Sequence, residues 1–330
     1  MLSTIYKLNP WSSSPRRPLP PLPQEIKGEV LAHLPNTRDY FRAAHLDTSW
    51  RTAALDVPAL QRHLRQNGRS GPPDLSALME TAAAILATER NLCAGRCHVR
   101  LMSLEDFARA STGARTSPQN PFRLPPEERW SRTRVGTSAN GHWAVTADRS
   151  SEDFNTFDIV VWALGQEQSK RGAGQVTPRA KPDWLKVNGG DGGWLRAAPE
   201  VVDVAVSDCG HRALVHAPHD DYLLHMASGK SITTVLRGGR GYRDFDMTAP
   251  TACLAPSGRW GVIDVDPWKR GLSLWNFTGP RPQCTTLDDP NLRGPKEELF
   301  FSPDESRIYV RLCRQSLAYC LDFGAGALPA

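Results

Sequence analysis

The second half of the chain repeats one local plan, and this repetition limits the possible folds more than any other feature. In each copy an apolar run enters a tight turn, leaves it as a second apolar run, and is followed by a third. Glycine or Ser-Pro-Asp marks the turns, as in hairpins that need a positive φ angle. The copies span residues 135–147, 204–217, 253–265 and 299–312, and their third runs span 159–164, 222–228, 272–277 and 316–323.

The turn positions of the copies are Gly141, Gly210, Gly258 and Glu305, and the last two intervals between them are 48 and 47 residues. A hairpin with one further strand is unstable alone, so each unit must pack on its neighbours. A period of this length suits a four-stranded propeller blade. We expect residues 130–330 to form an all-β, propeller-like domain of about four or five blades, as a closed ring or an incomplete one.

The same region resembles the WD-repeat and related β-propeller families in a degenerate form. Trp162 precedes Ala163 and Trp275 precedes Asn276, where the family favours aspartate. The Gly-His pair that begins a family blade is missing at the expected positions. A β-sandwich is the other architecture compatible with these strands.

A different periodicity marks residues 22–55. Pro23 suits the first position of a helix, where a missing N–H costs nothing. Ile26, Val30 and Leu34, with Leu31 beside them, form one apolar helical stripe. Two further short helices are expected before residue 55. Helices this short are unstable alone, so they must bury their apolar stripes against each other or against a partner.

This stretch resembles the F-box family. The matching pieces are Leu-Pro-x-Glu-Ile at 22–26, Val-Leu-x-x-Leu-Pro at 30–35 and Ser-Trp-Arg at 49–51. Tyr40 stands where family members usually have leucine. The resemblance implies docking onto the Skp subunit of a cullin–RING ubiquitin ligase. The implied contact positions are Leu22, Pro23, Ile26, Val30, Leu31, Leu34 and Trp50.

These observations divide the chain into an α+β multidomain protein. Residues 1–21 are rich in proline and serine and are expected to be a disordered arm. Residues 22–67 form the F-box-like helical module. Residues 68–129 are expected to be a connection, with a helix at 74–92 and a proline-rich part at 111–129. The β domain follows from residue 130.

Charge and cysteine usage narrow the class of protein. The net charge of +5 is spread along the chain without a run of like charges, so no specific nucleic-acid surface is expected. The seven cysteines are irregularly spaced, which favours reduced thiols and a cytoplasmic or nuclear location. No apolar run is long enough to cross a membrane. We expect no cofactor and no bound metal, although the His and Asp residues between 211 and 225 contain metal-ligand types.

The sequence thus predicts a ubiquitin-ligase adaptor that is not an enzyme. The helical module would hold the ligase through the Skp subunit, and the β domain would bind an unknown protein substrate. Two alternatives remain: an interaction scaffold whose helices are a purely structural cap, and a propeller hydrolase. The candidate substrate-binding residues are aromatic or basic side chains of the β domain, namely Trp184, Trp194, Arg240, Tyr242 and Trp268.

Overall fold

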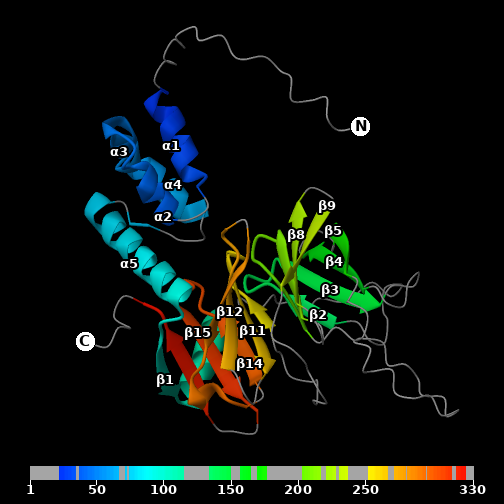
Figure 1. Ribbon diagram of the computed structural model, residues 1–330. Coiled ribbons are helices and arrows are strands. Elements are labelled where there is room, and N and C mark those ends of the chain that lie inside the picture. Colours follow the sequence, from blue (N-terminus) through cyan, green and yellow to red (C-terminus); the bar gives the residue numbers. More distant parts are fainter. Residues whose placement is uncertain are drawn as a thin grey trace, which may run out of the picture.

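The computed structural model places the N-terminal helices at one end of the molecule and the antiparallel sheets at the other (Figure 1). The residues that the structure describes are 22–34, 37–66, 71–72, 74–114, 134–149, 157–164, 169–176, 203–216, 221–227, 230–236, 252–266, 271–279, 281–294, 296–313 and 317–324. The predicted order of helices first and strands afterwards is therefore confirmed, and the fold is α+β.

The helical module begins with the short helices that the sequence predicts. Asp47 caps the third of them by accepting hydrogen bonds from the backbone N–H groups of Ser49 and Trp50. Tyr40 is fully buried, and its hydroxyl donates to the carbonyl of Ala54 at 3.0 Å, so the tyrosine adds an interhelical bond that a leucine could not make. The helices are α1 (Gln24–Ala32), α2 (Thr37–Ala43), α3 (Thr48–Ala54) and α4 (Val57–Gln66).

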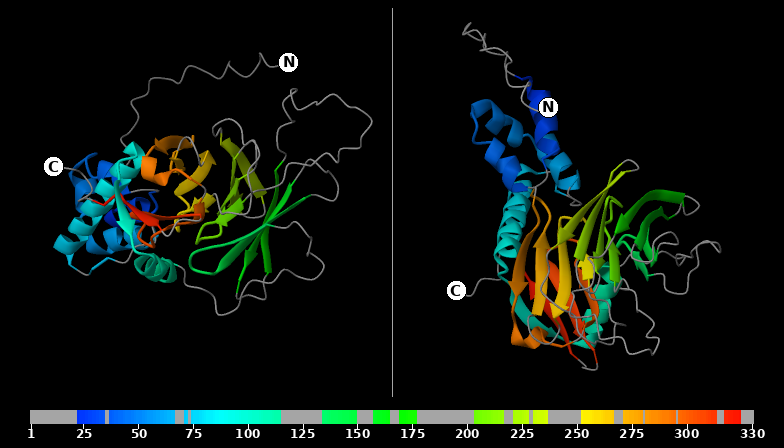
Figure 2. Two further views of the ribbon diagram at one scale, coloured as in Figure 1. Left: turned by 90° about the horizontal axis from the view of Figure 1, so that it is seen from below. Right: turned by 45° about the vertical axis from the view of Figure 1, so that its right-hand side comes forward.

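A longer helix, α5 (Leu75–Ala94), joins this module to the β domain. Its N-terminus is capped by Asp74, which accepts from the N–H of Ala77, as the sequence predicts. Its N-terminal half packs Leu78 and Ile85 into the core of the module, whereas Leu92 near its C-terminus lies in the core of the β domain. The module therefore projects beyond one end of the β domain, with α5 as the link (Figure 2).

The described part of the β domain contains four sheets, each of four antiparallel strands, and each sheet is called a blade below. Blades 1 to 3 each use consecutive strands. Blade 1 contains β2 (Arg134–Thr137), β3 (Trp143–Arg149), β4 (Phe157–Ala163) and β5 (Ser169–Val176). Blade 2 contains β6 (Asp203–Val206), β7 (Arg212–His216), β8 (Asp221–Ala227) and β9 (Lys230–Leu236). Blade 3 contains β10 (Ala252–Leu254), β11 (Trp260–Asp266), β12 (Gly271–Asn276) and β13 (Gln283–Leu287).

Blade 4 combines the two ends of the domain. Its strands β14 (Lys296–Phe301), β15 (Arg307–Leu312) and β16 (Ala318–Asp322) come from the C-terminal region, and the fourth strand is β1 (His98–Met102). β1 pairs antiparallel with β16, with Arg100 opposite Cys320. The prediction that residues 68–129 are only a connection is therefore wrong. The β domain begins before residue 130, because the edge of β16 takes its partner strand from this segment.

The four predicted turns are equivalent in the structure. Gly141, Gly210, Gly258 and Glu305 have φ angles of 68°, 69°, 71° and 57°, and each N–H donates to the carbonyl three residues earlier. Glycine meets no steric penalty at such angles, whereas Glu305 is a non-glycine residue in a left-handed conformation. The aligned turns confirm the repeated plan and a count of four blades within the described residues.

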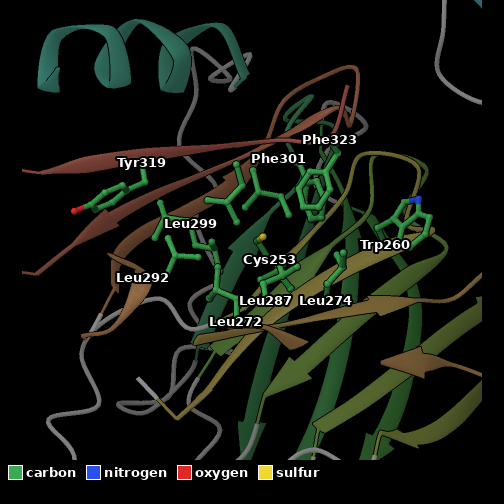
Figure 3. Packing of buried hydrophobic residues seen from close by; sticks show 14 of the residues in the cluster. Cys253, Trp260, Leu272, Leu274, Leu287, Leu292, Leu299, Phe301, Tyr319 and Phe323 are labelled. Atoms are coloured by element: carbon green, nitrogen blue, oxygen red, sulfur yellow. The ribbon is translucent and has the colours of Figure 1, made fainter. Parts of the chain in front are cut away.

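Apolar side chains between successive blades form the core. Val145 and Ile159 of blade 1 pack against blade 2 in one cluster, and Leu214 of blade 2 packs with Ile263 and Trp275 of blade 3 in another. Between blades 3 and 4, Leu272, Leu274 and Leu287 lie opposite Leu299 and Phe301 (Figure 3). The sheets thus stack face to face through apolar interfaces, as propeller blades do.

A further helix, α6 (Leu104–Ala114), covers the other face of blade 4. Phe107 and Ala114 are buried there against Phe300 and Tyr309, and the rings of Phe107 and Phe300 meet edge-on with centroids 5.4 Å apart. This is the face on which a following blade would pack. Helix α6 covers this face instead. Both α6 and β1, the fourth strand of blade 4, come from residues that precede the first blade in the chain.

Candidate functional site

Three apolar side chains in α1 and just before it are exposed. Leu22, Ile26 and Val30 have relative exposures of 49%, 47% and 44%, and they follow one another at intervals of four residues. Within a helix this spacing places Ile26 and Val30 on the same face, and Leu22 precedes the first turn of α1. We call these three residues the docking stripe. An aligned apolar stripe of this kind is typical of a surface that binds another protein.

The other F-box-like positions lie beside or behind the stripe. Pro23 is exposed, and Leu34 and Trp50 are half-buried. Leu31 has no exposed surface and lies in the core of the module with Tyr40, so in this conformation it supports the docking stripe from within. The structure therefore separates the contact positions implied by the family resemblance into surface and core residues.

Lys27 connects α1 to α3 beneath the docking stripe. Its ammonium contacts the hydroxyl of Ser49 and lies 5.7 Å from the centroid of the Trp50 ring, although the side chain is almost fully buried. A cation over an aromatic face is attracted by the ring quadrupole. Lys27 thus fixes the position of Trp50 relative to α1, a role that the sequence pattern did not indicate.

The candidate substrate-binding residues cannot be placed on this surface. Trp184, Trp194, Arg240, Tyr242 and Trp268 all lie outside the described residues. They stay predictions from the sequence. Of the residues considered as metal-ligand types, His216 and Asp221 are buried together, with His216 Nδ1 in contact with Asp221 Oδ1. No cluster of three or more His, Cys, Asp or Glu suited to a metal ion occurs in the part of the chain that the structure describes.

A second candidate site lies where the blade turns converge. A pocket of about 630 Å³ is lined by residues of all four turns, by the C-terminal end of α6 and by one arginine of α4. We call it the turn pocket. Its lining includes Arg65, Gly113, Ala114, Ala139, Asn140, Asp208, Cys209, His211, Arg212, His225, Pro256, Ser257, Arg259, Thr278, Pro303 and Glu305.

Two carboxylates of the turn pocket tie neighbouring turns together. Asp208 Oδ1 accepts the N–H of Asn140 at 3.0 Å, which joins the turns of blades 1 and 2. Glu305 Oε1 accepts the N–H of Ser257 at 2.6 Å, which joins the turns of blades 3 and 4. Burial raises the pKa of Asp208 despite these bonds. Both carboxylates therefore have structural partners within the protein.

Arg212 makes a third contact between neighbouring turns. Its guanidinium donates to the carbonyl of Gly258 at 2.8 Å, which joins the turns of blades 2 and 3. Burial lowers the pKa of Arg212, because desolvation penalises its charged form. Among the described residues, no carboxylate lies within ion-pairing distance of Arg212 or of Arg65. The turn pocket thus contains two arginines, Arg65 and Arg212, that no carboxylate of the described residues pairs with.

The thiols show no pairing. All seven cysteines lie in the described residues and none of them forms a disulfide bond. Burial raises the pKa of Cys97 to about 11, and it also raises the pKa of Cys93 and Cys284. These thiols are therefore protonated near neutral pH, where a thiol is a poor nucleophile. Within the described residues no helix is both long and apolar enough to span a bilayer.

Comparison with known proteins leaves the family open. No family model and no curated protein matches the sequence. Among solved structures, the chain is similar to Kuenenia stuttgartiensis hydrazine synthase, with 10% identity, a TM-score of 0.38, and coverage of 59% of this chain and 58% of that one. It is also similar to the β-propeller domain of Myceliophteria thermophila Cps50 (Swd1), with 12% identity, a TM-score of 0.33, and coverage of 58% and 52%. The chain spans little more than half the length of either protein, and likeness at this level carries no conclusion about function.

Proposed function

We propose that the chain is a substrate-recognition adaptor of a cullin–RING ubiquitin ligase. In this proposal the helical module docks onto the Skp subunit, and the propeller-like domain binds a protein target. The observation that carries the proposal is the docking stripe. Leu22, Ile26 and Val30 match F-box positions in sequence and are exposed, Ile26 and Val30 on α1 and Leu22 just before it.

Burying the three side chains of the docking stripe against a partner would be more favourable in free energy than leaving them exposed to water. Full burial of a Leu, Ile or Val side chain contributes about 1.5–3 kcal/mol, so covering three half-exposed side chains contributes about 3 kcal/mol. The polar residues of α1, including Glu25 and Glu29, lie beside them and leave the stripe as the apolar part of that surface. A partner with an apolar groove would bind this helix face.

The β domain supplies the second surface that an adaptor needs. Its blades are fixed relative to α5 by the apolar core around Leu92 and by hydrogen bonds from Asn91 to the carbonyls of Phe323 and Gly324 at 3.0 and 3.2 Å. A target bound to this domain would be held near the ligase at high effective concentration. The adaptor needs no catalytic residue of its own, and its cysteines, which form no disulfide bond, suit a reducing cytoplasm or nucleus.

The alternative is an interaction scaffold whose helices are a structural cap. The complete burial of Leu31, an implied contact position, is the observation that favours it. The two functions differ in whether the docking stripe binds the Skp subunit. They can be separated by changing exposed residues that make no contribution to the core.

The experiment is a pull-down of the purified full-length chain on immobilised Skp subunit. Ile26→Asp and Val30→Asp each place a charge in the docking stripe, and the matched control is Leu104→Asp on the first turn of α6, where the leucine is 43% exposed. We expect the wild type and the control to be retained and both stripe variants to be lost. Equal retention of all four proteins, or retention of none, would leave the scaffold function instead.

A further inference from the structure

We propose that the turn pocket binds a small anionic molecule that carries a carboxylate or phosphate group. The site is separate from the docking stripe, and the inference does not depend on the proposed adaptor function. It rests on the pocket at the convergence of the four turns and on the state of the charged groups that line it.

The first step of the argument concerns the cations. Arg212 is half-buried, and among the described residues its guanidinium donates to the carbonyl of Gly258, whose dipole compensates a full charge poorly. Arg65 enters the same pocket from α4. His225 lies directly opposite Arg212 on the neighbouring strand and also lines the pocket. An anion in this pocket would therefore meet the guanidinium groups of Arg65 and Arg212.

The second step concerns the acidic groups of the pocket. Asp208 Oδ1 accepts a hydrogen bond from the backbone N–H of Asn140. Glu305 Oε1 accepts one from the backbone N–H of Ser257, and Glu305 Oε2 lies 3.6 Å from Arg259 Nη2. Arg259 is also paired with Glu89 at 3.1 Å. Arg259 is therefore neutralised within the protein, whereas Arg65 and Arg212 have no such partner among the described residues. These hydrogen bonds do not remove the charges of the two carboxylates, so the lining side chains, three arginines against Asp208 and Glu305, sum to a formal charge of +1.

The third step concerns the size and the lining of the pocket. A volume of about 630 Å³ falls within the usual range of small-molecule sites. Ala114, Ala139, Pro256 and Pro303 give it apolar walls, and the hydroxyl of Thr278 and the amide of Asn140 are polar groups of its lining. A planar guanidinium forms paired hydrogen bonds to carboxylate or phosphate oxygens, which fixes the orientation of such a group. The occupant is thus an organic or inorganic anion of low molecular weight.

The position of the pocket gives the ligand a structural effect. Arg65 belongs to the helical module, Ala114 to α6, and the remaining lining residues to the blades. An anion held by both Arg65 and Arg212 would add a link between the module and blade 2. Ligand binding would therefore stabilise the folded chain and fix the orientation of the module relative to the β domain.

The test is isothermal titration calorimetry of the full-length chain with two probes, citrate and inorganic phosphate, at constant ionic strength in chloride. The variants are Arg65→Gln, Arg212→Gln and Arg212→Lys, and Arg281→Gln removes the same charge from an exposed position outside the pocket. We expect the wild type and Arg281→Gln to bind with equal Kd. We expect Arg65→Gln and Arg212→Gln to weaken binding about tenfold or more, with Arg212→Lys intermediate.

The two probes distinguish the chemical source of the anion. Tighter binding of citrate assigns the pocket to a carboxylate ligand, and tighter binding of phosphate assigns it to a phosphoryl ligand. The proposal is overturned if neither probe binds the wild type, or if the Arg65→Gln variant binds as tightly as the wild type. Arg65 is exposed on α4, so this variant is informative even if a change at Arg212 disturbs the fold.

Discussion

Arg259 Nη1 lies 3.1 Å from Glu89 Oε1 and so joins α5 to the turn between β10 and β11 of blade 3. Both side chains are mostly buried, and the same guanidinium also faces Glu305 of blade 4 at 3.6 Å. One arginine therefore holds the linking helix and two blades together. This joint fixes how the helical module is presented relative to the β domain.

Removing Arg259 would leave Glu305 buried without its cation. We expect Arg259→Met to lower the free energy of unfolding by about 3–5 kcal/mol, the usual cost of breaking a buried ion pair from one side. Glu89→Gln should cost less, because Glu305 then still faces Arg259. Urea unfolding followed by circular dichroism measures both changes. A loss below about 1 kcal/mol for Arg259→Met would show that the joint is not structural.

The helical module should lose stability in mild acid because of His63. This side chain is fully buried beside the Tyr40 ring, with centroids 4.5 Å apart, and burial lowers the pKa of His63 to about 4. The unfolded chain binds a proton near pH 6.5, so it binds more protons than the folded chain between these two values. Stability from this group is complete above pH 6.5 and is lost as the pH falls towards 4.

The expected loss is about 1.4 kcal/mol for each unit of difference between the two pKa values, or about 3 kcal/mol in total. Urea unfolding at several pH values between 7 and 4 measures it. Other acidic groups titrate in the same range, so the wild type should be compared with His63→Leu. The difference between their pH profiles isolates His63, and parallel profiles would contradict this account.

Gly95 should not tolerate a side chain. It ends α5 with a φ of 63°, and a Cβ there would lie 2.5 Å from the Thr285 side chain of blade 3. We expect Gly95→Ala to cost more than about 1 kcal/mol, from backbone strain and from displacement of Thr285. Gly113→Ala is the matched control, because this helical glycine has no atom within 4 Å of an added Cβ. Chemical denaturation should show a small gain of about 0.5–1 kcal/mol for the control.

The fourth blade should depend on β1. A chain that begins at residue 98 retains the partner strand of β16, whereas a chain that begins at residue 104 lacks it and exposes the edge next to Leu321. Exposed strand edges promote aggregation. We expect the shorter fragment to sediment as large species and the longer one to contain a larger monomeric fraction. Equal behaviour of the two fragments would mean that β1 is dispensable.

The repeated turns and the helical stripe could be predicted because they depend on local chemistry. A left-handed turn position favours glycine, and this preference alone aligns Gly141, Gly210 and Gly258. The spacing of Ile26 and Val30 defines a helix face in the same way. These signals predicted the order of the elements and one helix face containing Ile26 and Val30, but not that Leu31 is buried in the core of the module.

The features that the sequence did not predict depend on contacts between distant segments. β1 is a five-residue strand between two helices, and its partner β16 lies near the other end of the chain. Its sequence, HVRLM, alternates polar and apolar residues as a strand does, but no local pattern identifies β16 as its partner. The hydrogen bonds accepted by Asp208 and Glu305 join separate blades. That Arg212 contacts a carbonyl and no carboxylate among the described residues becomes evident only from these contacts between blades.

Calorimetric titration of the full-length chain with the purified Skp subunit tests the proposed adaptor function most directly. We expect binding with a negative heat-capacity change, because the docking stripe is apolar. We also expect its loss in Ile26→Asp and Val30→Asp, with unfolding midpoints unchanged and Leu104→Asp binding as the wild type does. Absence of heat with the wild type, or equal affinity of the stripe variants, would contradict the proposal that α1 is the docking surface.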